Sequence, residues 1–210
     1  MSEDRSQFSA FWLYQRRDDW RATVHPRWQE ACAEFVEALE CPGNEVTVRG
    51  VYSVMGMSAR ADMIVWAHAP RLEQLTRLAV RLDQTAIGAA LRLAQTYVGV
   101  AGMSQYDPEH GPAFLKGIPP RRYLSVYPFT KTPEWYLVPF EERRRLMIEH
   151  GRMGREFPEI LTNTVNSFGL QDQEFIVALE DDDPHQLVRM VQRLRGAEVR
   201  RYTAIDTPIF

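Results

Sequence analysis

The pattern of apolar and polar positions in the first half of the chain predicts six elements in the order β-α-β-β-α-β. Short runs rich in β-branched and aromatic residues indicate strands, and apolar positions at helical spacing indicate helices. The predicted strands are 8–13, 46–55, 61–67 and 97–103, and the predicted helices are 18–39 and 70–92. The buried face of the first helix is expected to include Trp28, Ala31, Phe35 and Leu39.

The second half of the chain shows the same order of elements. The predicted strands are 122–129, 160–168, 174–179 and 199–202, and the predicted helices are 141–157 and 184–194. Between the halves, residues 104–120 are rich in proline and glycine and predict a linker or a functional loop. We therefore expect an N-terminal half at 1–104, a connecting loop at 105–120 and a C-terminal half at 121–210.

A shift of 112 residues places 61–82 over 173–194 without a gap, and seven of the 22 aligned residues are identical. Both segments read as a strand followed by a helix, which suggests an internal duplication. Two β-α-β-β-α-β halves predict an α+β fold of two ferredoxin-like units. Such sheets stack face to face or close into a dimeric α+β barrel with the helices outside.

Composition excludes several classes of protein. The net charge of −3 and the pI near 6.0 argue against a non-specific nucleic-acid binder, which carries an excess of Lys and Arg. No run of 18 apolar residues predicts a membrane span, and the acidic, polar start does not resemble a secretory signal. Cys32 and Cys41 form neither a metal-type pair nor a haem-attachment motif, so we expect a cytoplasmic, reduced protein.

One histidine lies on an apolar helical stripe. The stripe of the helix 141–157 consists of Leu146, Met147, Met153 and Phe157. His150 lies on it beside Gly151 and Gly154, and each glycine costs a helix interior about 1 kcal/mol relative to alanine. This pattern fits a flat ligand such as haem, with His150 as axial ligand and Glu149 or another carboxylate orienting the imidazole. The alternative is a hydrogen-bonded core histidine with glycines for helix packing.

Two other segments carry residues suited to chemistry. Arg122, Tyr127 and Lys131 place a phenol between two cations, a set that can bind carboxylates or support oxidation of the tyrosine. His110, in the proline- and glycine-rich loop, is a candidate general base near neutral pH. Taken alone, each is more simply explained as a solvated surface residue. Asp181–Asp183 precede Pro184 and most simply cap the last helix.

The stretch YPFTKTPEWYLVPFEERRRLMIEHGRMGRE resembles the C-terminal half of coproheme decarboxylases, the hydrogen peroxide-dependent haem synthases of the chlorite dismutase superfamily. The resemblance covers essentially the whole chain and is strongest to the actinobacterial branch. It implies a dimeric α+β barrel in each subunit, a homopentamer and a transient contact with ferrochelatase. It also implies that two propionates of Fe-coproporphyrin III (coproheme) are oxidised by hydrogen peroxide to vinyl groups, giving haem b.

The resemblance assigns roles residue by residue. His150 matches the proximal iron ligand, Tyr127 the tyrosine that becomes a radical, and Lys131 a basic residue that holds a propionate. Trp135 matches an aromatic residue near the second reactive propionate, and His110 the distal histidine of the actinobacterial branch. A further propionate contact falls to one of the two neighbouring arginines, Arg200 and Arg201.

Other functions stay open at this point. Chlorite dismutases need a distal arginine, and the nearest aligned stretch, 160–166, has none. A dye-decolourising-type peroxidase, a haem carrier without turnover and a non-haem ferredoxin-like barrel are the remaining alternatives. A carrier has no need of a redox tyrosine, which speaks for an enzyme.

Overall fold

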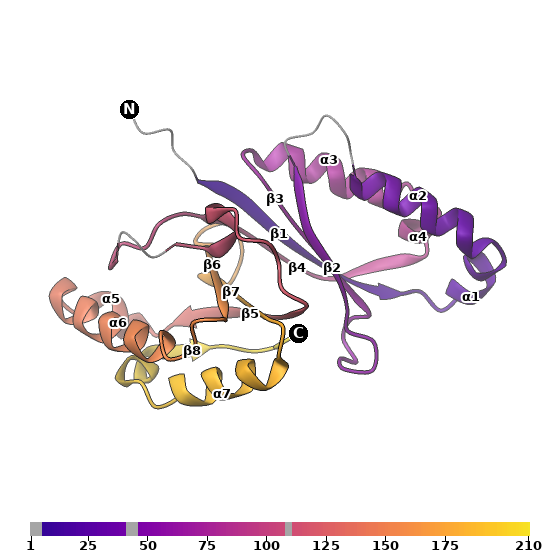
Figure 1. Cartoon of the computed structure of the whole chain (residues 1–210). Helices are drawn as coiled ribbons and strands as arrows, with labels where there is room; N and C mark the ends of the chain where they lie inside the picture. The colour runs from indigo at the N-terminus through magenta and orange to yellow at the C-terminus, as the bar shows by residue number, and fades with distance from the viewer. Residues whose placement is uncertain (1–5, 41–45, 108–110) are drawn as a thin grey trace. The chain divides into compact units, whose positions relative to one another are not determined.

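The computed structural model describes residues 6–40, 46–107 and 111–210 (Figure 1). Within them the chain forms two compact units, 6–98 and 99–210. The predicted division at 1–104, 105–120 and 121–210 stays a prediction; within 105–120 a short 3-10 helix, η2 (Ala113–Lys116), is present. No helix of the described ranges is long and apolar enough to cross a bilayer.

The first unit is a four-stranded antiparallel sheet with helices packed on it. Its main elements are β1 (Gln7–Arg16), α2 (Trp28–Glu40), β2 (Thr47–Ser53), β3 (Met63–Ala69), α3 (Leu72–Asp83) and β4 (Leu91–Ala101), the last residues of which belong to the second unit. The strand order is β2-β3-β1-β4. The core lies between sheet and helices, where Trp12 and Val65 of the strands pack with Phe35, Leu75 and Leu78 of the helices.

The second unit repeats this arrangement. Its main elements are β5 (Tyr123–Lys131), α5 (Pro133–Leu137), α6 (Phe140–Gly154), β6 (Leu161–Asn166), β7 (Phe175–Asp181), α7 (Pro184–Leu194), the 3-10 helix η3 (Glu198–Tyr202) and β8 (Thr203–Ile205). The strand order is β6-β7-β5-β8. It equals the order of the first unit when β1, β2, β3 and β4 are replaced by β5, β6, β7 and β8. The predicted α+β class with two ferredoxin-like halves is confirmed.

The internal shift of 112 residues holds in three dimensions. Moving β3 (Met63–Ala69) by 112 residues gives the bounds of β7, Phe175–Asp181. The same shift moves the start of α3 at Leu72 onto the start of α7 at Pro184. The residues that the sequence shift aligns therefore occupy equivalent positions in the two units, as an internal duplication requires.

Two predicted helices were wrong in their bounds, and the strand predicted at 97–103 begins earlier, at Leu91 of β4. The helix 18–39 is broken into α1 (Trp20–Thr23), η1 (His25–Arg27) and α2, because Pro26 lacks the N–H that a continuous helix needs. Trp28 is 49% exposed, and Ala38 is buried on the inner face instead. The helix 70–92 ends at Asp83; Thr85 then caps the short helix α4 (Ala86–Ala89) by accepting from the Gly88 N–H at 2.9 Å.

The predicted strand 199–202 was also wrong. Residues Glu198–Tyr202 form the 3-10 helix η3, and the strand follows it as β8. The last strand is fixed by pairing with β5, in which Thr203 lies opposite Lys131 and Ile205 opposite Thr130. This long-range pairing carries the chain end alongside a strand that bears candidate site residues.

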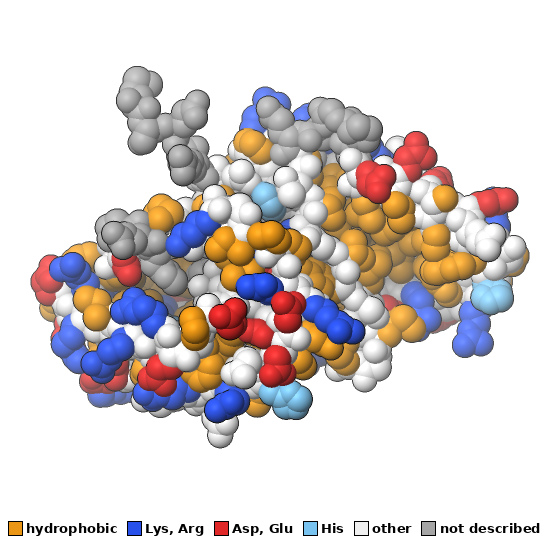
Figure 2. Space-filling model, viewed as in Figure 1, with side chains coloured by type: hydrophobic (Ala, Val, Ile, Leu, Met, Phe, Trp, Pro, Cys, Tyr) orange, Lys and Arg blue, Asp and Glu red, His pale blue; other side chains and the backbone are white. Residues whose placement is uncertain are grey.

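Charges of both signs are interspersed over the outer face of α6 and α7 in the second unit (Figure 2). Arg145 binds Glu142 at 2.6 Å and Glu198 at 2.9 Å, and Arg193 binds Glu156 at 2.8 Å. This mixed surface agrees with the small net charge of the chain.

Candidate active site

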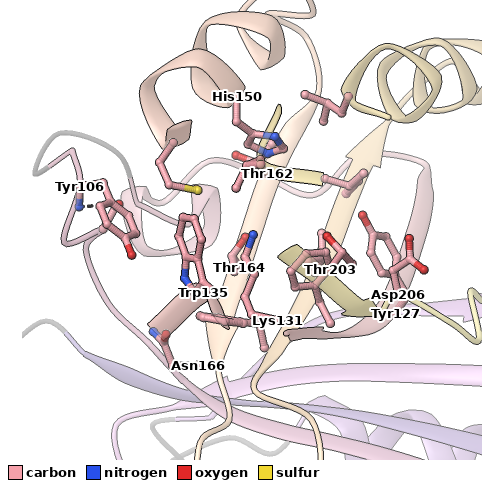
Figure 3. Close-up of a pocket in the computed structure, with 18 of the residues that line it drawn as sticks. Tyr106, Tyr127, Lys131, Trp135, His150, Thr162, Thr164, Asn166, Thr203 and Asp206 are labelled. Carbon is pink, nitrogen blue, oxygen red and sulfur yellow. Dashed lines mark hydrogen bonds between the residues drawn. The ribbon is translucent and has the colours of Figure 1, made fainter. Parts of the chain in front are cut away.

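A cavity of about 490 Å³ lies within the second unit, between the sheet, the helices α6 and α7, and the segments 102–106 and 111–112 (Figure 3). Strand side chains alternate between the two faces of a sheet, so every second residue of three strands lines it. These residues are Tyr127, Phe129 and Lys131 of β5, Thr162, Thr164 and Asn166 of β6, and Phe175, Val177 and Leu179 of β7. A cavity of this size accommodates a large organic ligand.

The helix α6 forms another wall and directs His150 into the cavity (Figure 3). Met147, three residues earlier on the same face, also lines the cavity. Leu146 and Met153 are buried and pack with Trp135 instead. The apolar stripe of the sequence is thus two adjoining faces, one for the core and one for the cavity.

The glycines beside His150 do not make room for a ligand, contrary to the sequence interpretation. A Cβ atom on Gly154 would lie 3.7 Å from Met190 Cε, an ordinary contact with α7, and one on Gly151 would lie 3.9 Å from Arg155 Nη1. Neither glycine lines the cavity. The Glu149 carboxylate accepts from the Glu198 N–H at 3.2 Å and so anchors η3, and its predicted role in orienting the imidazole stays a prediction.

Tyr127 is a partly buried phenol among three charged groups. Burial raises its pKa to about 12; the positive charge of Arg195 lowers the pKa, the negative charge of Asp206 raises it, and the positive charge of Arg200 lowers it. The phenol is therefore protonated at neutral pH, and any oxidation of Tyr127 must also remove its proton.

Lys131 is a buried cation, 8% exposed, packed against aromatic rings. Its Nζ lies 4.5 Å from the ring centre of Trp135 and 5.2 Å from that of Phe129. Burial lowers its pKa to about 8, against the raising effect of the Glu174 carboxylate, while Arg200 lowers it further. The nearby Glu174 carboxylate thus does not fully offset the cost of burying the Lys131 ammonium group. An anionic group of a ligand could bind this ammonium group through a charge-assisted hydrogen bond.

Arg195 and Arg200 both bind the carboxylate of Asp206 at the cavity wall. Arg200 Nη1 lies 3.0 Å from Asp206 Oδ2, and Arg195 donates to the same oxygen. Arg200 lines the cavity, whereas Arg201 turns to the surface and pairs with Glu198 at 2.6 Å. Sequence reasoning missed Arg195 and Asp206, because only the fold of η3 and β8 brings them to Tyr127.

The structure places Tyr127, Lys131, Trp135, His150 and Arg200 around the one cavity. Predicted His110 lies outside the described residues, although the next two residues, 111 and 112, line the cavity.

Arg122 is not part of the site, contrary to the sequence interpretation. It stacks on Tyr123 at 5.5 Å, and its N–H donates to Asp182 at 2.9 Å. The predicted cap of the last helix is confirmed for Asp183, which accepts from the His185 N–H at 2.9 Å, whereas Asp181 and Asp182 accept from the N–H groups of Asp183 and Arg122. Neither feature contributes to the cavity.

The donor set suits an iron porphyrin that carries carboxylates. His150 offers one imidazole for an axial position, and the apolar side chains Met147, Phe129 and Val177 offer surfaces for a flat ring. Lys131, Arg195 and Arg200 supply cations for the carboxylates at other points of the same wall. One cavity therefore combines the two kinds of contact that such a ligand requires.

The family model described as Chlorite dismutase matches residues 28–210. The chain belongs to the chlorite dismutase family. Within this family it is 38% identical over 182 residues to the coproheme decarboxylase of Mycolicibacterium smegmatis, covering 86% of this chain and 78% of that relative. The family membership and the actinobacterial resemblance predicted from the motifs are confirmed.

Solved structures of chlorite dismutases share the fold of this chain. A mutant chlorite dismutase from Candidatus Nitrospira defluvii superimposes with a TM-score of 0.87 at 23% identity, covering 100% of this chain and 91% of that one. The enzyme from the same organism in complex with imidazole gives a TM-score of 0.85 at 22% identity, covering 98% and 88%. At this identity the likeness concerns the fold alone.

Proposed function

We propose that this chlorite dismutase family member is a coproheme decarboxylase, which converts two propionates of coproheme into vinyl groups with hydrogen peroxide and releases haem b. The observation that carries the proposal is the single cavity that joins His150 to Tyr127, Lys131 and Arg200. The named relative at 38% identity supports the same activity.

The chemistry at each propionate balances with one peroxide. The group R–CH₂–CH₂–COO⁻ with one H₂O₂ and one proton gives R–CH=CH₂, CO₂ and two H₂O. The propionate is oxidised by two electrons and the peroxide is reduced by two. The bound iron porphyrin supplies the redox chemistry that links the two.

The residues of the chain bind the substrate and direct its oxidation. His150 holds the iron from α6, and Lys131 and Arg200 bind propionates through charge-assisted hydrogen bonds. Tyr127 takes a hydrogen atom from the β-carbon of a propionate held beside its phenol. Fixing these groups together converts an encounter into an intramolecular step, which lowers the barrier by several kcal/mol.

Two further residues complete the proposed site. Trp135, 2% exposed and beneath the Lys131 ammonium, forms a rigid wall at the second reactive propionate. His110 serves as the distal base that deprotonates peroxide, a role that rests on the family resemblance.

Chlorite chemistry is the less favoured alternative within the family. The cavity face of β6 consists of Thr162, Thr164 and Asn166, which are uncharged. The arginines of the cavity, Arg195 and Arg200, are both bound to Asp206 near the tyrosine. This distribution of charge suits carboxylate binding beside Tyr127.

Mass spectrometry of the porphyrin tests the proposal. The protein loaded with coproheme and titrated with hydrogen peroxide is expected to yield a three-propionate species and then haem b. Each step removes one CO₂ and two hydrogens. Coproheme treated with peroxide in the absence of protein is the control, and an oxygen electrode with added chlorite measures the alternative. Oxygen release without loss of CO₂ from coproheme would replace the proposal by chlorite dismutation.

The proposed cellular setting follows the family resemblance. We propose a homopentamer in the cytoplasm, which receives coproheme through a transient contact with a ferrochelatase. Light scattering of the purified protein measures the number of subunits, and a mass other than that of a pentamer would correct this part.

A further inference from the structure

Asp206 lies beside Tyr127 because the chain end runs along β5. Thr203 pairs with Lys131, Ile205 with Thr130, and further on Phe210 and Val126 exchange two backbone hydrogen bonds of 2.9 Å. Asp206 follows Ile205 within this antiparallel stretch. Its side chain is 16% exposed and lies next to the Tyr127 ring at the cavity wall (Figure 3).

The proposed reaction requires Tyr127 to lose a proton as well as an electron. Burial raises the pKa of its phenol to about 12, so the O–H bond is intact at neutral pH. A phenol that has lost an electron is a strong acid, and a base within reach makes the loss of both particles easier. The site therefore needs a group that accepts the phenolic proton of Tyr127.

Among the described residues, the charged groups around Tyr127 leave one candidate acceptor. These groups are Arg195, Arg200, Asp206 and, on the same face of β5, Lys131. Arginine stays protonated in proteins, and Lys131, with a pKa of about 8, is mostly protonated at neutral pH. Among the described residues that line the cavity, Asp206 is the only carboxylate.

The two arginines leave one oxygen of the Asp206 carboxylate available to accept a proton. Both donate to Oδ2 of Asp206, and Oδ1 is engaged by neither. They hold the side chain of Asp206 at the cavity wall. Asp206 is thus a fixed base rather than a solvated surface acid.

We propose that Asp206 accepts the phenolic proton of Tyr127 when this tyrosine is oxidised. The inference rests on the proposed function. The Tyr127 O–H bond breaks, its proton moves to Asp206, and its electron goes to the oxidant that hydrogen peroxide supplies. The phenoxyl oxygen then takes a hydrogen atom from the propionate β-carbon, which re-forms the O–H bond. The second electron also goes to the oxidant that hydrogen peroxide supplies, the bond between the propionate α-carbon and the carboxylate breaks, CO₂ leaves, and the Asp206 proton ends in water.

Asp206→Asn keeps the shape of the side chain and its acceptor oxygen but cannot take up a proton. We expect this variant to bind coproheme at least as tightly as the wild type, because one negative charge near the propionates is gone. Decarboxylation should fall by about 10²-fold, the scale of general base catalysis. Freeze-quench EPR should show a matching loss of tyrosyl radical. Added formate should restore part of the rate in this variant, and Asp206→Glu should retain most of it. The exposed acid Asp172, which does not line the cavity, gives the matched control Asp172→Asn.

A second measurement needs no substrate. A fluorinated tyrosine placed at position 127 of the ligand-free protein ionises at milder pH and can be titrated by absorbance. We expect Asp206→Asn to lower its pKa, because the carboxylate that opposes a phenolate is removed. An unchanged pKa would show that Asp206 does not act on the phenol and would overturn the inference.

The failures of the inference and of the proposed function are distinguishable. Normal turnover by Asp206→Asn, with Tyr127→Phe inactive, would assign the proton to the propionate or to water and overturn only the inference. Parallel loss of coproheme binding and turnover without rescue by formate would reduce Asp206 to a structural support of Arg200, which also overturns it. A wild-type protein that leaves coproheme unchanged would refute the proposed function itself.

Discussion

Replacing the buried cation Lys131 by methionine is expected to stabilise the ligand-free protein while weakening substrate binding. The ordinary lysine pKa of 10.5 falls to about 8 in the folded chain, chiefly because burial disfavours the charged form. The difference corresponds to about 3 kcal/mol of unfavourable free energy carried by the charged side chain at neutral pH. Replacing buried ion pairs by apolar side chains of similar volume is often neutral or stabilising by about 1–4 kcal/mol. Lys131→Met should therefore raise the free energy of unfolding at pH 7 by about 2 kcal/mol.

The sign of the pH dependence follows from proton binding. Between about pH 8 and 10.5 the unfolded chain binds more protons at this lysine than the folded chain does, so Lys131 makes stability rise with pH across that window. The advantage of Lys131→Met should accordingly be full below pH 8 and shrink as the pH approaches 10.5. Urea unfolding at pH 7 and at pH 9.5 measures it.

The chain offers a matched control and a direct assay. Its only two lysines are Lys116 and Lys131, and Lys116 is exposed. Lys116→Met should leave stability within about 0.5 kcal/mol of the wild type at both pH values. Reductive methylation with ¹³C-formaldehyde followed by NMR titration gives the pKa of each amine. A Lys131 pKa near 10.5, or a destabilised Lys131→Met protein with a pH-independent difference, would refute the reasoning.

Three other residues give predictions that the same assays address. His150→Ala should abolish the iron–histidine band in resonance Raman spectra of the coproheme-loaded protein, and an unchanged band would remove His150 as the ligand. His110→Ala should slow the reaction with peroxide, by about 10²-fold in a stopped-flow assay, more than it weakens coproheme binding; an unaltered rate and pH profile would exclude it as the base. Arg200→Ala should weaken coproheme binding by about tenfold, whereas Arg201→Ala, which removes a surface arginine outside the cavity, should not; equal effects in fluorescence-quenching titrations would contradict this assignment.

The order of elements could be predicted from the sequence because short segments already show the apolar spacing of strands, every second residue, and of helices, every three to four residues. The helix 184–194 was predicted with the bounds that it has, since Asp183 and Pro184 mark its start. Bounds failed where a distant partner decides them: β8 begins at Thr203 only because β5 lies beside it. Pro26 is a local signal for a break in the helix 18–39 that the apolar spacing masked.

The candidate site also contains residues that the sequence predicted and residues that only the fold brings together. His150, Tyr127 and Lys131 stood out through motifs, and the fold brings them to one cavity. Arg195 and Asp206 had no local signal, because their proximity to Tyr127 depends on the return of the chain end. The glycines near His150 suggested a ligand from composition alone, yet Gly154 faces α7. Spacing on one helix therefore says which residues share a face, but not what that face contacts.

The central claim is that Tyr127 relays the oxidation of the propionates, and its most direct test is the product spectrum of Tyr127→Phe. This variant keeps the ring and its packing between the strand and α7 but lacks the O–H group. The account predicts that it binds coproheme and consumes peroxide as the wild type does, while mass spectrometry finds coproheme with all four propionates and almost no three-propionate species or haem b. Haem b formed by Tyr127→Phe at a near-normal rate would contradict the account.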